Sequence, residues 1–340
     1  MKKVLLTGVS GFVGKQVAIE LLSNNYEVVG TVRDKNLILS TQNTIKSQGV
    51  NINKLSFVEL DLLNDAGWDD AAKGCNYIIH VATPFPMKVS RDRELLTPVA
   101  VDGMLRVFNA GISANVEHFV LTSSMFAMSR QKNRTNPYFI GENDWTDLDW
   151  SGASDYFVAK TKQEKAAWSL MEKKGIKNKL TVINPGAIWG KTLDDKLSTS
   201  LVYIKNFLLG QFPAAPNAMF LISDISDVAK AHVISLSNDE SRGRRLIVGS
   251  EAKSLIDVSE ILSNSFPEYK KKLPKRLMPN FLIKIISIFD SSVKTLIPDL
   301  GLKLVVDTSY SEKILKFKFK SAESSIVGAA QSLIDLKLIK

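Results

Sequence analysis

The fold of this chain is indicated by the residues Thr7-Gly8-Val9-Ser10-Gly11-Phe12-Val13-Gly14. They follow a short apolar run at residues 2–8, which predicts a buried strand that ends at a glycine turn. Apolar residues recur with helical spacing over residues 11–24, and a second apolar run at residues 27–32 predicts another strand. Strand, glycine turn, helix and strand in this order form a βαβ unit, which begins a parallel sheet.

The spacing of the three glycines indicates a ligand at this turn. Gly8 permits the sharp turn, Gly11 lets the backbone approach a pyrophosphate, and Gly14 lets the helix lie close to the strand. The first helical residues, Phe12 and Val13, then present unpaired N–H groups to the phosphates. A glycine turn without a ligand is the alternative, and the position between strand and helix disfavours it.

The residue at the end of the second predicted strand indicates which dinucleotide is bound. An acidic residue there would bind the ribose 2′-hydroxyl of NAD. This strand ends instead in Arg33, whose guanidinium matches a 2′-phosphate in charge and geometry. The sequence therefore predicts NADP, although Asp34 follows directly.

Strands and helices continue to alternate, which predicts an α/β fold with a doubly wound parallel (Rossmann) sheet. Ligands of such sheets lie at the carboxyl ends of the strands, and polar residues gather at those ends here. Asp61 follows one strand and is placed to meet an adenine edge. The other clusters follow strands at 77–81, 119–121 and 180–183; they are Ala82-Thr83-Pro84, Thr122-Ser123-Ser124 and Asn184-Pro185-Gly186.

The chain divides into two regions on this pattern. Residues 1–189 are expected to form the NADP-binding Rossmann domain, with its sheet completed by part of 219–250. Residues 190–340 are expected to form mainly a substrate-binding region. The long polar segment 125–154 is typical of a substrate-side loop.

Tyr156 and Lys160 are four residues apart, so they lie on one face of the same predicted helix. A nearby ammonium favours the phenolate and can make a tyrosine a usable acid–base group. The spacing alone also fits a core tyrosine beside a solvated lysine.

Together these residues resemble the extended short-chain dehydrogenase/reductase family. The similarity is to its dihydroflavonol reductase, cinnamoyl-CoA reductase and aldehyde/ketone reductase branch. Two departures are Ala159, where a serine commonly precedes the motif lysine, and Asp102, which stands where many relatives have asparagine and puts a proton relay in doubt. The motifs that carry the resemblance are Thr7 to Gly14, Thr31 to Asp34, Asp61-Leu62, His80 to Pro84, Leu121 to Ser124, Tyr156 to Lys160 and Asn184 to Gly190.

The resemblance implies NADPH-dependent reduction of a small aldehyde or ketone, aromatic or medium aliphatic, to the alcohol. Tyr156 would protonate the carbonyl oxygen, Lys160 would lower the pKa of Tyr156 and hold the nicotinamide ribose, and Ser124 would orient the carbonyl. Ser123 is the less favoured serine. The implied cofactor-binding residues are Gly8, Gly11, Phe12, Val13, Gly14, Arg33, Asp61, Leu62, Val81, Ala82, Thr83, Tyr156, Lys160, Pro185 and Ile188. An apolar substrate pocket would draw on Phe85, Met87, Met125, Phe126, Trp189 and Phe220.

Two other functions remain open from the sequence. An NAD(P)-dependent sugar-nucleotide epimerase or dehydratase shares the fold and the Tyr–Lys pair. Met125 and Phe126, after the serine run, disfavour a dehydratase, which usually has Asp-Glu there, and Arg33 disfavours tightly bound NAD. A non-catalytic NADP-sensing Rossmann protein typically lacks the Tyr–Lys pair.

Composition limits the location and the partners. With one cysteine, Cys75, no apolar run of transmembrane length and no cleavage-site pattern, we expect a cytoplasmic monomer or homodimer without a membrane span. The net charge is +9, with basic residues concentrated in 270–303, but no nucleic-acid motif accompanies them. The three histidines and the acidic residues show no metal-ligand spacing, so we expect no metal, and His80 is expected in the core.

Overall fold

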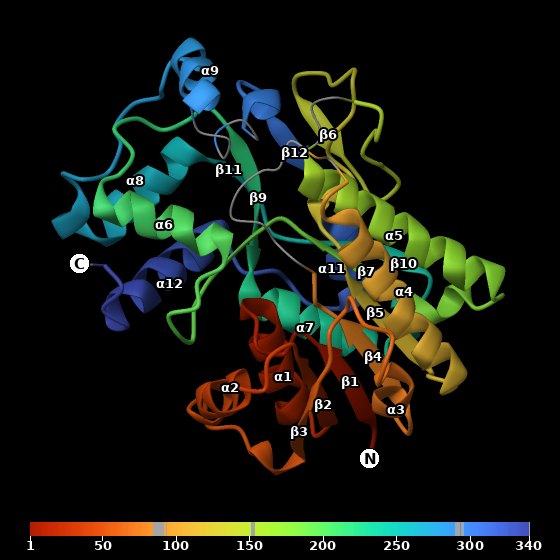
Figure 1. The fold of residues 1–340 in the computed structure, drawn as a ribbon. Helices are drawn as coiled ribbons and strands as arrows, with labels where there is room; N and C mark the ends of the chain where they lie inside the picture. The colour runs from red at the N-terminus through yellow and green to blue at the C-terminus, as the bar shows by residue number, and fades with distance from the viewer. Residues whose placement is uncertain (84–91, 93, 151–153, 290–292, 294–295, 340) are drawn as a thin grey trace.

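The computed structural model describes all 340 residues except 84–91, 93, 151–153, 290–292, 294–295 and 340 (Figure 1). At its centre is a seven-stranded sheet in the order β10-β7-β5-β4-β1-β2-β3, and every neighbouring pair is parallel. The strands are β1 (Lys3–Thr7), β2 (Glu27–Val32), β3 (Leu55–Glu59), β4 (Tyr77–His80), β5 (His118–Thr122), β7 (Leu180–Pro185) and β10 (Arg244–Val248). This confirms the doubly wound parallel sheet predicted from the alternating pattern.

Helices cover both faces of this sheet. Strand β1 shows the division, because Val4 and Leu6 pack in the core with α1 and α7, whereas Leu5 packs in the core with α4 and α5. Figure 1 shows α4 and α5 side by side, and α1 beside α7, as their contacts also indicate. The sheet helices are α1 (Phe12–Ser23), α2 (Leu37–Lys46), α3 (Trp68–Ala72), α4 (Thr97–Ser113), α5 (Asp155–Lys173) and α7 (Ile225–Ser235).

A second apolar core joins helices of the later part of the chain, which Figure 1 shows at the left. It is built mainly from α6, α8 and α12, with Trp189 among them. The later helices are α6 (Thr199–Leu209), α8 (Leu255–Ser265), α9 (Asn280–Phe289) and α12 (Ala322–Asp335), together with α11 (Ser309–Leu315), which packs on the core of the large sheet through Leu315.

Two small sheets connect the large sheet to the later part of the chain. One has the order β11-β9-β8, from β8 (Ala187–Trp189), β9 (Met219–Asp224) and β11 (Ala252–Ser254). The other pairs β6 (Tyr138–Ile140) in parallel with β12 (Leu304–Val306). The predicted loop 125–154 thus contains a short strand, because residues far along the chain supply its partner.

Among the described residues, no helix has both the length and the apolar character needed to cross a membrane. His80 is buried, as expected, and Cys75 is buried as well. The Nδ1 of His80 lies 3.0 Å from Oγ1 of Thr7, so this histidine has a core partner.

Candidate active site

The glycine turn joins β1 to α1 with the geometry that the spacing predicts. Gly8 has φ +71°, and a Cβ there would lie 3.0 Å from the Cα of Ala82. A Cβ on Gly14 would lie 2.1 Å from the carbonyl oxygen of Gly8, so only glycine lets α1 approach β1 this closely. Gly11 is exposed and caps α1 without a side-chain hydrogen bond, and Phe12 and Val13 begin the helix. This leaves the first amides of α1 available to a ligand such as a pyrophosphate.

The other residues predicted to bind the cofactor lie where neighbouring strands of the sheet end. Arg33 is exposed directly after β2, and Asp61 and Leu62 are partly buried after β3. Beyond β4, the amides of Val81 and Ala82 both donate to Oγ1 of Thr7, each at 3.1 Å. On the other side of the sheet's centre, Pro185 ends β7 and Ile188 lies in β8. The fold therefore brings these segments to one edge of the sheet, and their contacts with a cofactor stay a prediction.

Tyr156 is held beside Ser124. It lies in the first turn of α5, packs against Leu96, Ala100 and Ala159, and meets the ring of Phe126 edge to face at 5.9 Å between ring centroids. Burial raises the pKa of Tyr156, and a side-chain hydrogen bond with Ser124 acts in the opposite direction. At neutral pH the phenol is therefore protonated and able to donate.

Ser124 and Ser123 face different partners. Ser124 follows β5, and its Oγ accepts a hydrogen bond from the amide of Phe126 at 3.2 Å. The Oγ of Ser123 donates instead to Oε2 of Glu164 at 2.6 Å, inside the protein. Of the two serines, Ser124 is thus the one beside Tyr156, and its role in orienting the carbonyl stays a prediction.

Lys160 lies one helical turn after Tyr156 and is 3% exposed. Its Nζ donates to Oγ1 of Thr83 at 3.0 Å, to the carbonyl oxygen of Thr122 at 2.9 Å and to Oε1 of Gln163 at 3.2 Å. Burial lowers the pKa of Lys160 to about 7, against the opposing effect of the carboxylate of Glu164. We expected Lys160 to lower the pKa of Tyr156. In the structure this pKa is raised, because burial outweighs the other influences on the phenol.

Glu164 is a residue of this site that the sequence reasoning missed. It is fully buried on α5, and its Oε2 accepts from Ser123 and, at 2.8 Å, from Nδ2 of Asn184. The same Nδ2 lies 3.2 Å from the carbonyl oxygen of Ser124. Arg245, on β10, completes the arrangement with an ion pair to Glu164. The signal was the spacing, because Glu164 follows Lys160 by four residues and so lies on the same face of the helix.

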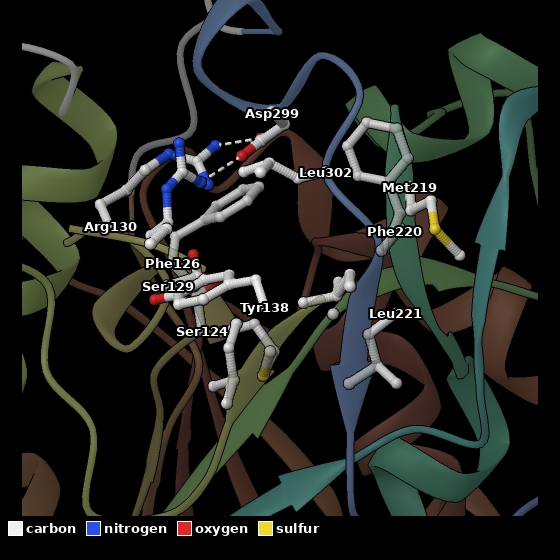
Figure 2. Close-up of a pocket in the computed structure, with 16 residues that line it drawn as sticks. Ser124, Phe126, Ser129, Arg130, Tyr138, Met219, Phe220, Leu221, Asp299 and Leu302 are labelled. Carbon is white, nitrogen blue, oxygen red and sulfur yellow. Dashed lines mark hydrogen bonds and ion pairs between the residues drawn. The ribbon is translucent and has the colours of Figure 1, made fainter. Parts of the chain in front are cut away.

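A pocket begins at Ser124 and extends away from the sheet (Figure 2). Much of its lining is apolar, from Met125, Phe126, Met219, Phe220, Leu221 and Leu302. Figure 2 shows Arg130 and Asp299 on one side of the open space, with Met219 and Phe220 on the other. The polar side, which also includes Arg134 and Tyr138, was not predicted from the sequence.

Three of the six apolar pocket residues predicted from the sequence, Met125, Phe126 and Phe220, line this pocket. Trp189 does not; it is 2% exposed in the core around α6, and its Nε1 donates to the carbonyl oxygen of Ser200 at 2.9 Å. Phe85 and Met87 lie outside the described residues. Asp102 is exposed on α4.

Comparison with known proteins gives consistent similarities. A model of the NAD dependent epimerase/dehydratase family matches residues 4–249. Cinnamoyl-CoA reductase 1 of Oryza sativa subsp. japonica is 34% identical over 272 residues, covering 78% of this chain and 76% of that protein. Dihydroflavonol 4-reductase of Arabidopsis thaliana is 30% identical over 277 residues, covering 78% and 70%. The crystal structure of Gre2 from Candida albicans in complex with NADPH is 26% identical, with a TM-score of 0.78 and 99% of both chains covered.

Proposed function

Because the chain belongs to the NAD dependent epimerase/dehydratase family, we propose that it reduces the carbonyl group of a small aldehyde or ketone to an alcohol with NADPH. The resemblance to the extended short-chain dehydrogenase/reductase family is thereby confirmed. One observation carries the proposal. A protonated Tyr156 shares a side-chain hydrogen bond with Ser124, which lines a largely apolar pocket, and Lys160 lies one turn further along the same helix.

The proposed cofactor fits the residues at the edge of the sheet. The tight approach of α1 to the Gly8 turn leaves no room for a side chain at Gly14, as a pyrophosphate-binding turn requires. Arg33 is exposed after β2, where a guanidinium can bind a 2′-phosphate. The relatives support the choice, since the Candida Gre2 structure contains NADPH. When bound, NADPH supplies the hydride that reduces the carbonyl carbon.

The residues of the chain then have distinct tasks. Ser124 donates to the carbonyl oxygen and orients it, and Tyr156 delivers the proton that this oxygen needs as it becomes an alcohol. The raised pKa of Tyr156 supports a donor in the reductive direction, because the phenol keeps its proton until the oxygen gains negative charge. The Nζ of Lys160 donates to Thr83, Thr122 and Gln163, and it would exchange one of these partners to hold the hydroxyls of the nicotinamide ribose.

We also propose that the region after residue 189 supplies the substrate side of the site. Met219, Phe220, Asp299 and Leu302 from this region line the pocket that starts at Ser124. Their largely apolar character favours an aromatic or medium aliphatic carbonyl compound over a sugar nucleotide.

The direct experiment follows NADPH oxidation by the purified protein with a panel of aldehydes, ketones and diketones, and repeats each reaction with NADH. We expect turnover of neutral aromatic or aliphatic aldehydes with NADPH, and slower turnover with NADH. Protein purified with tightly bound NAD and acting on a sugar nucleotide would replace this function by that of an epimerase. NADPH binding without turnover of any carbonyl would favour a sensing role.

A further inference from the structure

Two arginines and one aspartate form a buried cluster in the pocket that contains Ser124. Arg130 and Arg134 both form ion pairs with the carboxylate of Asp299, Arg134 at 2.8 Å. The side chains are 4%, 7% and 15% exposed in that order. Arg134 also donates to the carbonyl oxygen of Pro298. Figure 2 shows Arg130 and Asp299 of this Arg130–Arg134–Asp299 cluster beside the open space.

The cluster holds more donors than acceptors. Two guanidiniums meet one carboxylate, and a guanidinium carries five N–H donors. Asp144 lies near Tyr138, but its oxygens accept from the amide of Gly141 and from Gln131. Within the described part of the chain, it forms no ion pair with either arginine. The pocket therefore presents an excess of positively charged donors.

Three buried polar atoms of the pocket lining have no hydrogen-bond partner among the described residues. They are Nε of Arg130, the hydroxyl oxygen of Tyr138 and Oγ of Ser129. Each of these residues is more than nine-tenths buried. A buried polar group without a partner costs roughly 1–3 kcal/mol, so three in one pocket call for an explanation that a structural ion pair does not give. A bound anion that accepts hydrogen bonds from these groups would explain them.

We propose that this cluster binds an anionic group of the substrate, so that the enzyme favours aldehydes or ketones that combine an apolar body with a carboxylate. The inference rests on the proposed function, because the carbonyl is taken to lie at Ser124, which lines the same pocket. The planar fork of a guanidinium fits a carboxylate with two parallel hydrogen bonds. The apolar side chains that line the rest of the pocket accommodate the body of the substrate.

Matched substrates test the proposal. The probes are 4-formylbenzoate and 3-(4-formylphenyl)propanoate, each compared with its methyl ester. The ester group activates the benzaldehyde more than the carboxylate does, so electronic effects oppose the expected preference. We expect kcat/KM of the wild-type protein to be about tenfold higher for at least one carboxylate than for its ester, as a charge-assisted hydrogen bond implies.

A series of variants changes the charge of the cluster in steps. Arg130→Met leaves one arginine opposite Asp299 and should reduce the carboxylate-to-ester ratio to about one. Asp299→Asn removes the negative charge and should raise the ratio above that of the wild type. Lys132→Gln removes an exposed cation of the same loop, which is outside the pocket lining, and should leave the ratio unchanged. An equal loss for carboxylate and ester in Arg130→Met would mean a purely structural role and overturn the proposal.

A binding measurement separates this proposal from the proposed function. Calorimetry with 4-methylbenzoate, which cannot be reduced, should detect binding to the wild-type protein loaded with NADP⁺ and at least tenfold weaker binding to Arg130→Met. Thermal unfolding and NADPH binding of each variant show whether it is folded. Reduction of neutral aldehydes without any preference for carboxylates, and with no binding of 4-methylbenzoate, would leave the function in place and overturn the subsite alone.

Discussion

Arg245, on β10, donates a hydrogen bond from Nε to Oε1 of Glu164, on α5, in the interior of the protein. The exposed fractions of the two side chains are 9% and 0%. The Nη1 of Arg245 also donates to the carbonyl oxygens of Glu142 and Asp144, each at 2.7 Å. This pair therefore joins the helix that carries Tyr156 and Lys160 to the last strand of the sheet and to the segment before that helix.

Glu164→Gln should destabilise the fold strongly. The amide keeps the shape of the side chain but leaves Arg245 without its counter-charge in the interior, and loss of one partner of a buried pair costs about 3–5 kcal/mol. The free energy of unfolding, measured with urea, checks this. Glu172→Gln is the matched control, because Glu172 lies on the same helix and pairs with Lys177 on the surface, where such pairs contribute about 0–1 kcal/mol. Equal effects of the two substitutions would contradict the structural importance of the Glu164–Arg245 pair.

The glycine turn could be predicted from the sequence because its determinants are local. Gly8 must adopt a positive φ and Gly14 must lie against the Gly8 carbonyl, and both requirements follow from a strand that turns directly into a helix. The strand ends were predictable for a related reason. Each buried run is short and apolar, and it stops where polar residues begin, so Ser124 and Asp61 were placed correctly at the edge of the sheet.

The polar end of the pocket could not be predicted in the same way. Arg130 and Asp299 are far apart in sequence, and they meet where β12 pairs with β6, two strands of three residues each that carry no pattern of their own. The direction in which the pKa of Tyr156 shifts could not be predicted from the sequence either. It depends on how deeply the phenol is buried, which the spacing from Lys160 does not indicate.

Arg33→Asp should reverse the preference between the two nicotinamide cofactors. An aspartate after β2 repels a 2′-phosphate and accepts from a 2′-hydroxyl, so KM for NADPH should rise by about tenfold or more and KM for NADH should fall. The ratio of kcat/KM for NADPH to that for NADH measures the effect with the same aldehyde. Because Arg33 is exposed, the substitution should not unfold the protein, and a thermal unfolding measurement can verify this. An unchanged ratio would show that Arg33 does not contact the cofactor.

The three histidines should make the protein sensitive to acid. Burial lowers the pKa of His80 and His118 to about 3 and that of His232 to about 4. In the unfolded chain these groups bind protons below about pH 6.5, so the unfolded state gains protons that the folded state does not. Their contribution to stability is therefore complete above about pH 6.5 and is lost progressively as the pH falls toward 3.

A single substitution measures how much one of these histidines contributes to the pH dependence of stability. His118→Gln keeps a side chain able to reach Oγ1 of Thr181, which lies 2.9 Å from Nε2 of His118. The free energy of unfolding of this variant should depend less on pH between 6 and 4, by up to about 1.4 kcal/mol per pH unit. Urea unfolding at several pH values gives the pH dependence of the free energy of unfolding for the wild type and the variant. In the difference between the two, the contribution of the shared carboxylates cancels. Parallel curves would mean that His118 is protonated in the folded protein.

Tyr156→Phe should abolish most of the activity and leave the fold intact. The ring keeps its contacts with Leu96 and Ala100 and with the edge of Phe126, so the packing that holds the start of α5 is unchanged. What is lost is the hydroxyl that shares a hydrogen bond with Ser124 and would protonate the carbonyl oxygen. Positioned proton donors contribute roughly 10²–10⁴-fold, so kcat should fall by that factor while the Kd for NADPH stays within a few-fold.

Ser124→Ala provides the companion measurement for the same hydrogen bond. Removal of this hydroxyl deprives Tyr156 of the partner that lowers its pKa and deprives the carbonyl of a donor, so kcat should fall while NADPH binding persists. The double variant should lose little more than Tyr156→Phe alone, because the two hydroxyls act on one oxygen. Tyr310→Phe, which removes a phenol that packs beside the other face of the sheet, serves as the control and should retain normal turnover. Independent, additive losses in the double variant would show that Ser124 and Tyr156 do not act together on the substrate.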